Sequence, residues 1–252
     1  MKKAMVTGAS EGIGRAFALS LAARGYAVTA VARTESRLQS LLTEMSSTGV
    51  QKHDILIADI STTEGVAQVA NYLQIHKHHL LINNAGFSEF GAFFKTDITT
   101  QQNIMRVNCE AVVILSHRFL LNAVAGDAIV NVSSTLAFLP MPAQAVYSAS
   151  KAFVTSFSDS LWWEQRKRGI YVLAVCPGVT DSEFYTRAGG QAQHRPSRFI
   201  TQQPQTVVET TLTALEKRQN PGLISGVFNK AAYGLAKILP RKYIVSLMGR
   251  MR

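Results

Sequence analysis

Short apolar runs alternate along the chain with longer amphipathic stretches, and this alternation predicts the fold. Apolar runs of strand length, bounded by glycine or small polar residues, are typical of strands that are buried on both faces of a sheet. Seven runs fit this description: residues 3–7, 26–32, 54–60, 79–82, 128–134, 170–175 and 223–228. The intervening segments carry apolar residues every three or four positions, which is the helical period. Strands that alternate with helices predict the α/β class, with a doubly wound parallel Rossmann sheet of about seven strands and helices on both faces.

The pattern continues without an internal repeat, so we expect one domain over residues 1–252. Two segments depart from the pattern. Residues 184–203 are irregular, contain Gly189-Gly190, and are long for a connection inside a compact domain, which is typical of a substrate lid. Residues 229–252 form a basic amphipathic C-terminal extension.

Composition fits a folded domain, with 47% apolar and 17% charged residues. The net charge of +10 is concentrated at the C-terminal end, because eight of the 26 Lys and Arg residues and none of the acidic ones lie between Lys217 and Arg252. The preceding part is nearly neutral, with 18 basic and 16 acidic residues. This distribution argues against nucleic-acid binding as the main task.

Location is also constrained by the sequence. No apolar run reaches the roughly 18 residues that a membrane-spanning helix needs. Met1 is followed almost at once by a glycine motif, which leaves no room for a signal peptide. Cys109 and Cys176 are far apart in apolar surroundings, so we expect free thiols and a cytoplasmic protein.

Three glycines follow the first predicted strand and open an amphipathic helix. Gly8, Gly12 and Gly14 stand in the sequence T-G-A-S-E-G-I-G. Glycine lets the backbone approach a pyrophosphate, and the helix N-terminus supplies free N–H groups and a positive dipole end. The context of a strand, a turn and a helix predicts dinucleotide binding, whereas a tight turn alone would be the simpler reading.

Two charged residues bear on the adenosine half of such a cofactor. At the end of the second strand an acidic residue would accept hydrogen bonds from the ribose of NAD(H), whereas an arginine accommodates the phosphate of NADP(H). The sequence has Arg33 and no acid there, so we expect NADP(H) in preference to NAD(H). Asp59, after the third strand, is placed to meet the adenine amino group; capping of the next helix is the alternative.

Tyr147 and Lys151 are four residues apart, so both side chains leave the same face of a helix. An ammonium group beside a phenol favours the phenolate, and we expect Lys151 to lower the pKa of Tyr147. Ser134 ends the fifth strand at the same edge of the sheet. Asn108 lies among apolar neighbours on a long predicted helix, residues 100–124, and needs polar partners there; it either braces the backbone or serves the chemistry.

Seven motifs stand in one order along the chain: T-G-A-S-E-G-I-G (7–14), A-D-I (58–60), N-N-A-G (83–86), an asparagine (108), V-S-S (132–134), Y-S-A-S-K (147–151) and P-G (177–178). Together they resemble the short-chain dehydrogenase/reductase family over about residues 3–184. The resemblance implies that Tyr147 is the catalytic acid, Lys151 its partner, Ser134 the catalytic serine with Ser133 as its neighbour, and Asn108 the anchor of a proton relay. It also implies a set of cofactor contacts: Gly8, Ser10, Gly12, Ile13, Gly14, Asp59, Ile60, Asn83, Ala85, Gly86, Tyr147, Lys151, Pro177, Gly178, Thr180 and Ser182.

The implied activity is reversible carbonyl/alcohol interconversion by hydride transfer to or from NADP(H), without a metal. We expect a homodimer or homotetramer acting on a small-molecule substrate. Four aromatic residues after N-N-A-G favour a hydrophobic ketone or a β-ketoacyl group, which an acyl carrier could present; core and interface positions are the alternative for Phe87, Phe90, Phe93 and Phe94. The competing function is a non-catalytic NADP-binding regulator on the same fold.

The C-terminal extension carries an amphipathic stripe, with Ile244, Leu247, Met248 and Met251 at helical spacing and arginines and lysines beside it. Three interpretations remain open. The stripe packs against its own domain or a second copy, lies on an anionic membrane surface as a peripheral contact, or docks an acidic partner such as an acyl carrier protein.

Overall fold

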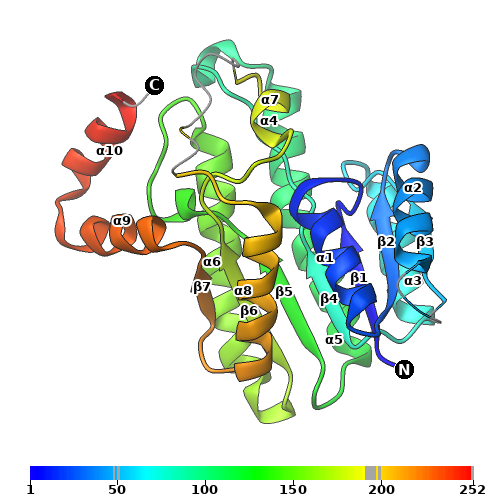
Figure 1. Ribbon diagram of the computed structural model, residues 1–252. Helices are drawn as coiled ribbons and strands as arrows, with labels where there is room; N and C mark the ends of the chain where they lie inside the picture. Colours follow the sequence, from blue (N-terminus) through cyan, green and yellow to red (C-terminus); the bar gives the residue numbers. More distant parts are fainter. Residues whose placement is uncertain (48, 50–51, 191–196, 198–199, 251–252) are drawn as a thin grey trace.

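The computed structural model describes residues 1–47, 49, 52–190, 197 and 200–250. Seven parallel strands form one sheet in the order β3-β2-β1-β4-β5-β6-β7 (Figure 1). The strands are β1 (Lys3–Thr7), β2 (Ala27–Ala32), β3 (Asp54–Ile57), β4 (Leu80–Asn83), β5 (Ala128–Val132), β6 (Tyr171–Cys176) and β7 (Gly222–Ile224). The doubly wound α/β fold predicted from the sequence is confirmed.

Helices cover both faces of the sheet. The helices are α1 (Gly12–Ala23), α2 (Glu35–Ser46), α3 (Thr63–Ile75), α4 (Ile98–Met105), α5 (Ala111–Asn122), α6 (Ala145–Gln165), α7 (Phe184–Arg187), α8 (Pro204–Lys217), α9 (Val227–Ile238) and α10 (Arg241–Arg250). Shorter helical turns are η1 (Phe93–Lys95), η2 (Arg106–Glu110), η3 (Thr135–Ala137) and η4 (Arg166–Arg168). α1, α2 and α8 pack on one face, and α3, α5 and α6 on the other.

Two apolar layers, one on each face, hold the sheet between the helices. Phe17 and Leu21 of α1 and Leu38 of α2 are fully buried against one face. Leu115 of α5 and Val69 of α3 are buried against the other. Because the central strands are covered on both faces, nearly every residue of β1, β2, β5 and β6 is buried, which explains their continuous apolar runs.

The order of the strands places the candidate site. The chain moves outward from β1 to β3, returns to β4 beside β1, and then moves outward in the other direction. The carboxyl ends of β1 and β4 therefore lie at the point where the strand order reverses, the position at which open α/β sheets bind their ligands.

Some predicted bounds differ from the observed ones. The single helix predicted over 100–124 is divided into α4 and α5 by η2, a turn of π-helix around Asn108. The predicted strand 223–228 ends at Ile224, and Val227 and Phe228 begin α9 instead. Gly226, with φ +89°, redirects the chain between the two elements.

Candidate active site

The turn between β1 and α1, called the glycine turn, has a backbone conformation and close packing that require glycine. Gly8 and Gly12 have φ angles of +65° and +53°, which favour glycine. A Cβ on Gly14 would lie 2.2 Å from the Gly8 carbonyl oxygen, and one on Gly8 would lie 2.8 Å from the Ala85 Cα. The turn therefore packs tightly against the end of β4. Of the other predicted turn residues, Ser10 is half-buried in the turn and Ile13 packs its side chain against the core.

Two residues that the sequence reading did not select hold this turn in place. The Thr7 hydroxyl accepts hydrogen bonds from the backbone N–H groups of Asn84 and Ala85, both at 3.1 Å. The Asn84 amide nitrogen donates to the carbonyl oxygens of Thr7 and Gly8 at 2.9 and 3.2 Å. Thr7 stands in the T-G motif and Asn84 in N-N-A-G. Their positions next to the motif glycines are the sequence signal from which their role in holding the turn could have been inferred.

Arg33 and Asp59 come together at the ends of β2 and β3. The Arg33 guanidinium lies 3.7 Å from the Asp59 carboxylate, and its side chain is 68% exposed. Ser61 donates its backbone N–H and its hydroxyl to Asp59 at 2.9 and 2.7 Å. Partial burial opposes ionisation of Asp59, but the Ser61 bonds and the Arg33 charge outweigh it and lower its pKa. Helix α3 is capped by Thr62 instead, so Asp59 is not its cap.

The two serines after β5 have different surroundings. The Ser133 hydroxyl donates to the Lys151 carbonyl oxygen at 2.8 Å and contacts the Thr155 hydroxyl at the same distance. Ser134 caps η3, accepting a hydrogen bond from the Leu136 N–H at 3.1 Å, and its side chain also acts on Tyr147, whose pKa it lowers. Ser134, rather than Ser133, therefore faces the tyrosine.

Tyr147 and Lys151 are both buried on the first two turns of α6. The Lys151 ammonium donates to the Val132 carbonyl oxygen at 2.8 Å and lies 5.6 Å from the centroid of the Tyr147 ring. The expected lowering of the Tyr147 pKa by Lys151 is wrong. Burial raises the pKa of Tyr147 to about 12, opposed only by the Ser134 hydrogen bond. Burial also lowers the pKa of Lys151 to about 8.

Asn108 sits fully buried in the π-helical turn η2. Its amide nitrogen donates to the Phe87 carbonyl oxygen at 3.1 Å and to the Ser150 hydroxyl at 3.0 Å. Its side-chain oxygen accepts from the Phe87 N–H at 3.2 Å. The side chain thus braces the segment after β4 against α6. π-Helical turns occur frequently at functional sites, and this one places Asn108 beside Lys151, since both lie close to Gly86.

Asn83 and Ile60 differ from the other expected cofactor contacts. The Asn83 amide nitrogen donates to Ser116 and Asn131 at 3.1 and 2.9 Å, inside the sheet. Ile60 is buried in the core between the sheet and α3. Both side chains therefore point into the protein and not toward the edge of the sheet, because the buried strand ends need internal partners. Ala85 and Gly86 do lie at the edge.

The segment after β6 closes the site from the other side. The Pro177 carbonyl oxygen accepts from the Thr135 N–H at 2.9 Å, next to Ser134. A Cβ on Gly178 would lie 2.4 Å from the Asn229 amide, so the chain passes close to α9 here. Thr180 donates its hydroxyl to the Gly178 carbonyl oxygen at 3.2 Å. The Ser182 Cβ lies 3.2 Å from the place where a Cβ on Gly12 would stand.

The predicted lid 184–203 begins with the helix α7, which the sequence reading took as irregular. The Phe184 ring lies 5.6 Å from the Tyr147 ring and partly covers it. An ion pair between Arg187 and Glu11 joins α7 to the glycine turn, and a second pair, between Glu183 and Arg187 at 2.9 Å, lies within α7 and its N-cap. Residues 191–196 and 198–199, with Arg195 and Arg198, lie outside the described residues.

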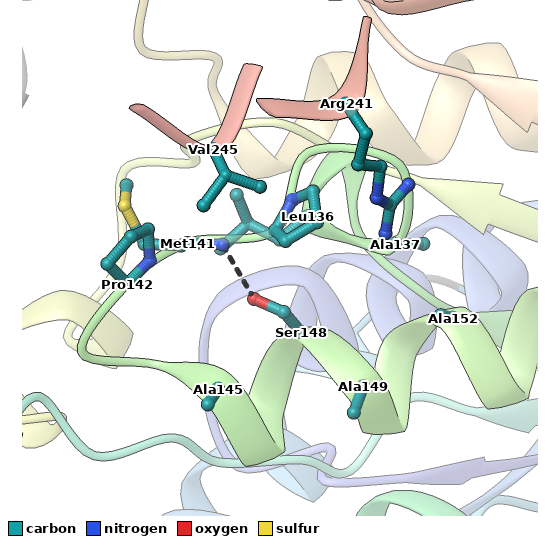
Figure 2. Close-up of a pocket in the computed structure, with 11 residues that line it drawn as sticks. Leu136, Ala137, Met141, Pro142, Ala145, Ser148, Ala149, Ala152, Arg241 and Val245 are labelled. Carbon is teal, nitrogen blue, oxygen red and sulfur yellow. Dashed lines mark hydrogen bonds between the residues drawn. The ribbon is translucent and has the colours of Figure 1, made fainter. Parts of the chain in front are cut away.

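An apolar cavity of about 330 Å³ lies beside the catalytic candidates, between α6, the loop after η3 and α10 (Figure 2). The Ser148 hydroxyl oxygen accepts a hydrogen bond from the Met141 N–H at 3.2 Å across its floor, and Arg241 and Val245 of α10 stand over it. Its lining residues are Leu136, Ala137, Pro140, Met141, Pro142, Ala145, Ser148, Ala149, Ala152, Arg241 and Val245.

The four phenylalanines after N-N-A-G do not gather into one pocket. Phe87 packs against the core. The Phe90 ring lies 5.3 Å from the Tyr185 ring of α7. Phe93 and Phe94 are 58% and 82% exposed. The apolar lining near the site therefore comes from the segment 136–142, which the sequence reading did not select.

The chain is similar in sequence to known proteins over most of its length. Mouse 17-beta-hydroxysteroid dehydrogenase type 3 is 33% identical over 178 residues, which cover 69% of this chain and 58% of that protein. The human protein named inactive hydroxysteroid dehydrogenase-like protein 1 is 33% identical over 203 residues, covering 78% and 58% of the two chains. This chain thus spans somewhat over half the length of these relatives.

A solved structure matches almost the whole fold. The short-chain dehydrogenase from Sphingobium yanoikuyae in complex with NADPH superposes with a TM-score of 0.82 and 27% identity, covering 96% of this chain and 97% of that one. The sequence model of the short chain dehydrogenases matches residues 2–192, which include the glycine turn, Ser134, Tyr147 and Lys151. The protein therefore belongs to the short-chain dehydrogenase family.

Proposed function

We propose that this protein is an NADP(H)-dependent oxidoreductase that interconverts a carbonyl and an alcohol by hydride transfer, with Tyr147 as the general acid and base. The observation that supports this most directly is that Tyr147 and Lys151 are buried one helical turn apart on α6, with the Ser134 side chain near enough to lower the pKa of Tyr147. A tyrosine inside hydrogen-bonding reach of a second hydroxyl suits proton transfer to a carbonyl oxygen.

The residues around the strand ends fit a dinucleotide. Gly8 and Gly14 pack against Ala85 and the Asn84 side chain without room for a Cβ; a turn of this kind can present the N–H groups at the start of α1 to a phosphate. Arg33 is exposed at the end of β2 with only a long contact to Asp59, and it would hold a ribose phosphate. Asp59, Ala85, Gly86 and the segment 177–182 would hold the remaining parts.

When bound, the nicotinamide supplies or accepts the hydride. Because burial keeps the pKa of Tyr147 at about 12, its phenol is protonated at neutral pH and is ready to donate a proton. That state suits carbonyl reduction. Ser134 would hydrogen-bond the substrate oxygen and orient it toward Tyr147. Phe184 shields the tyrosine from water, which strengthens these interactions.

The substrate class that we propose is a small molecule with a hydrophobic body, a ketone or a β-ketoacyl group. The apolar cavity formed by α6, residues 136–142 and α10 supports this choice, because it begins two residues after Ser134. The name of the mouse relative, a hydroxysteroid dehydrogenase, is compatible with a hydrophobic substrate.

A homodimer or homotetramer is also part of the proposal. The outer face of α6 exposes Phe153 and Trp163, at 43% and 57%, and an apolar helix face of this kind is suited to a subunit contact. Sedimentation velocity at several protein concentrations tests this, and a monomer at all of them would contradict it.

A non-catalytic NADP-binding protein is the second candidate, and a relative named inactive gives it weight. The two functions are separated by a spectrophotometric screen that follows NADPH oxidation with ketones and β-ketoacyl thioesters. We expect turnover with at least one hydrophobic carbonyl compound. NADPH binding without turnover on any member of a broad panel would favour the non-catalytic function.

A further inference from the structure

Helix α9 presents an apolar stripe to solvent. Val227, Phe228, Leu235 and Ile238 are 83%, 69%, 54% and 81% exposed. At 100° per residue these positions, together with Ala231, fall on one side of the helix. None of the side chains of Val227–Ile238 is buried, although α9 is the most amphipathic helix of the described chain. Exposed apolar residues that gather on one face mark a surface that contacts something else.

The other side of α9 holds it to the protein. The Tyr233 ring lies 4.5 Å from the Phe138 ring, and the Asn229 amide donates to the Ser225 carbonyl oxygen at 2.6 Å. Helix α10 follows and buries Ile244 and Met248. The two helices lie beyond β7 at one end of the molecule (orange to red in Figure 1). The stripe therefore points outward because the opposite side is the anchored one.

Positively charged side chains lie next to the apolar stripe of α9. Lys230 and Lys237 lie on one flank of it, by their helical positions, and Arg241 and Lys242 begin α10. All four are exposed. No acidic residue occurs in the sequence after Glu216, and within the described part of the chain none of these four cations forms an ion pair. An apolar stripe edged by lysines is the arrangement that binds the interface of an anionic bilayer.

From this geometry we propose that α9 docks the protein on an anionic membrane surface, with Phe228, Leu235 and Ile238 entering the boundary between headgroups and acyl chains and the lysines contacting lipid phosphates. This proposal stands apart from the proposed function, because it needs neither cofactor nor turnover. Among the described residues, no helix could cross a bilayer, so the contact is a peripheral one. The predicted stripe of α10 is not the docking face, because Ile244 and Met248 are buried; Met251 lies outside the described residues.

Charge argues against a second copy of the chain on this face, and shape argues against an acidic protein partner. A second copy that pairs through this face by a two-fold axis would bring the same lysines and arginines together without an acid between them. An acidic protein would satisfy the charges, but the apolar residues occupy the outermost side of a convex helix, which suits a soft apolar phase more than a rigid protein surface.

The test is sedimentation of the full-length protein with vesicles of phosphatidylcholine alone or with about a quarter phosphatidylglycerol. We expect binding to the anionic vesicles and little to the neutral ones. The double variant Leu235→Ser/Ile238→Ser should lose at least about tenfold in partitioning, because two buried apolar side chains are removed from the contact. The matched control is Ile75→Ser/Leu121→Ser, which changes two exposed residues on α3 and α5 and should bind as the wild type does.

Charge is tested in the same way. Lys230→Glu/Lys237→Glu should abolish binding to anionic vesicles, while Lys2→Glu/Lys52→Glu, with the same change in net charge, should weaken it only slightly. Thermal melting confirms that each variant is folded. Several results would overturn the proposal: no binding by the wild type, equal loss in test and control variants, or an α9 variant that only converts an oligomer to a monomer. Binding to a purified acyl carrier protein without binding to vesicles would do so as well.

Discussion

The Lys151 ammonium donates its hydrogen bond to the Val132 carbonyl oxygen, 2.8 Å away, while lying 5.6 Å from the centroid of the Tyr147 ring. The described surroundings of this cation include no carboxylate within ion-pair distance. Burial therefore dominates and lowers the pKa of Lys151 to about 8. The pair is thus a neutral phenol beside a lysine that loses its proton near physiological pH.

The lowered pKa predicts a specific dependence of stability on pH. In the unfolded chain Lys151 stays protonated to about pH 10.5, whereas in the folded chain it loses its proton near pH 8. Between these values the unfolded state binds more protons, so stability rises with pH. We expect the free energy of unfolding of the wild type, relative to Lys151→Met, to rise by up to about 3 kcal/mol over this window.

Urea unfolding at about pH 7, 8, 9 and 10 measures this difference without cofactor. Other lysines and tyrosines titrate equally in both proteins, so the comparison isolates Lys151. A difference that stays flat from pH 7 to 10 would show that the lysine is not desolvated as described.

Alanine substitutions at Gly14, in the glycine turn, and at Gly234, in α9, should have opposite effects on stability. A Cβ on Gly14 would meet the Gly8 carbonyl oxygen at 2.2 Å and the Asn84 amide at 2.4 Å. We expect Gly14→Ala to destabilise the protein by about 1–3 kcal/mol and to abolish NADPH binding. Gly234, in the middle of α9, has no described heavy atom within 4 Å of its added Cβ, so Gly234→Ala should stabilise by up to about 1 kcal/mol.

Differential scanning calorimetry and NADPH titration check both variants. Gly234→Ala serves as the matched control, since it makes the same chemical change in an open position. Normal NADPH binding by Gly14→Ala would mean that the turn relaxes and is not held by Asn84.

The exposed position of Arg33 predicts its role in choosing the cofactor. If its guanidinium binds the ribose phosphate, Arg33→Ala should weaken NADPH binding about tenfold or more, the loss of a charge-assisted contact, and leave NADH almost unchanged. Isothermal titration with both cofactors measures the gap. Arg37→Ala is the control, because Arg37 instead pairs with Glu11 and Glu183. Equal dissociation constants for NADPH and NADH in the wild type would contradict the assignment.

Much of the fold follows from the sequence, because strands buried on both faces must be apolar throughout and the glycines of the turn after β1 have φ angles or close contacts that other residues do not allow. The order of the motifs also placed Ser134, Tyr147 and Lys151 at one edge of the sheet. The local pattern of motifs was enough for this prediction, and the strand order agrees with it, as do the positions of Ser134 after β5 and of Tyr147 and Lys151 at the start of α6.

Other features depend on contacts that no local pattern encodes. The π-helical turn at Asn108 arises from bonds to Phe87 and Ser150, which are distant in sequence. Asn83 was expected at the cofactor edge, but its side chain serves Asn131 and Ser116. The pKa of Tyr147 was expected to fall, and burial raises it. The break at Gly226 turned an expected strand into the exposed start of α9.

The central claim, that Tyr147 transfers the proton, is tested by the kinetics of Tyr147→Phe with NADPH and a carbonyl compound found in the screen. The variant loses one buried hydroxyl, which should change stability by no more than about 1 kcal/mol. Tyr72→Phe, which removes a hydroxyl bonded to Asp54 far from the site, is the control. We predict that Tyr147→Phe lowers kcat/KM by about a hundredfold or more with NADPH affinity unchanged. Turnover near that of the wild type would contradict the proposed mechanism.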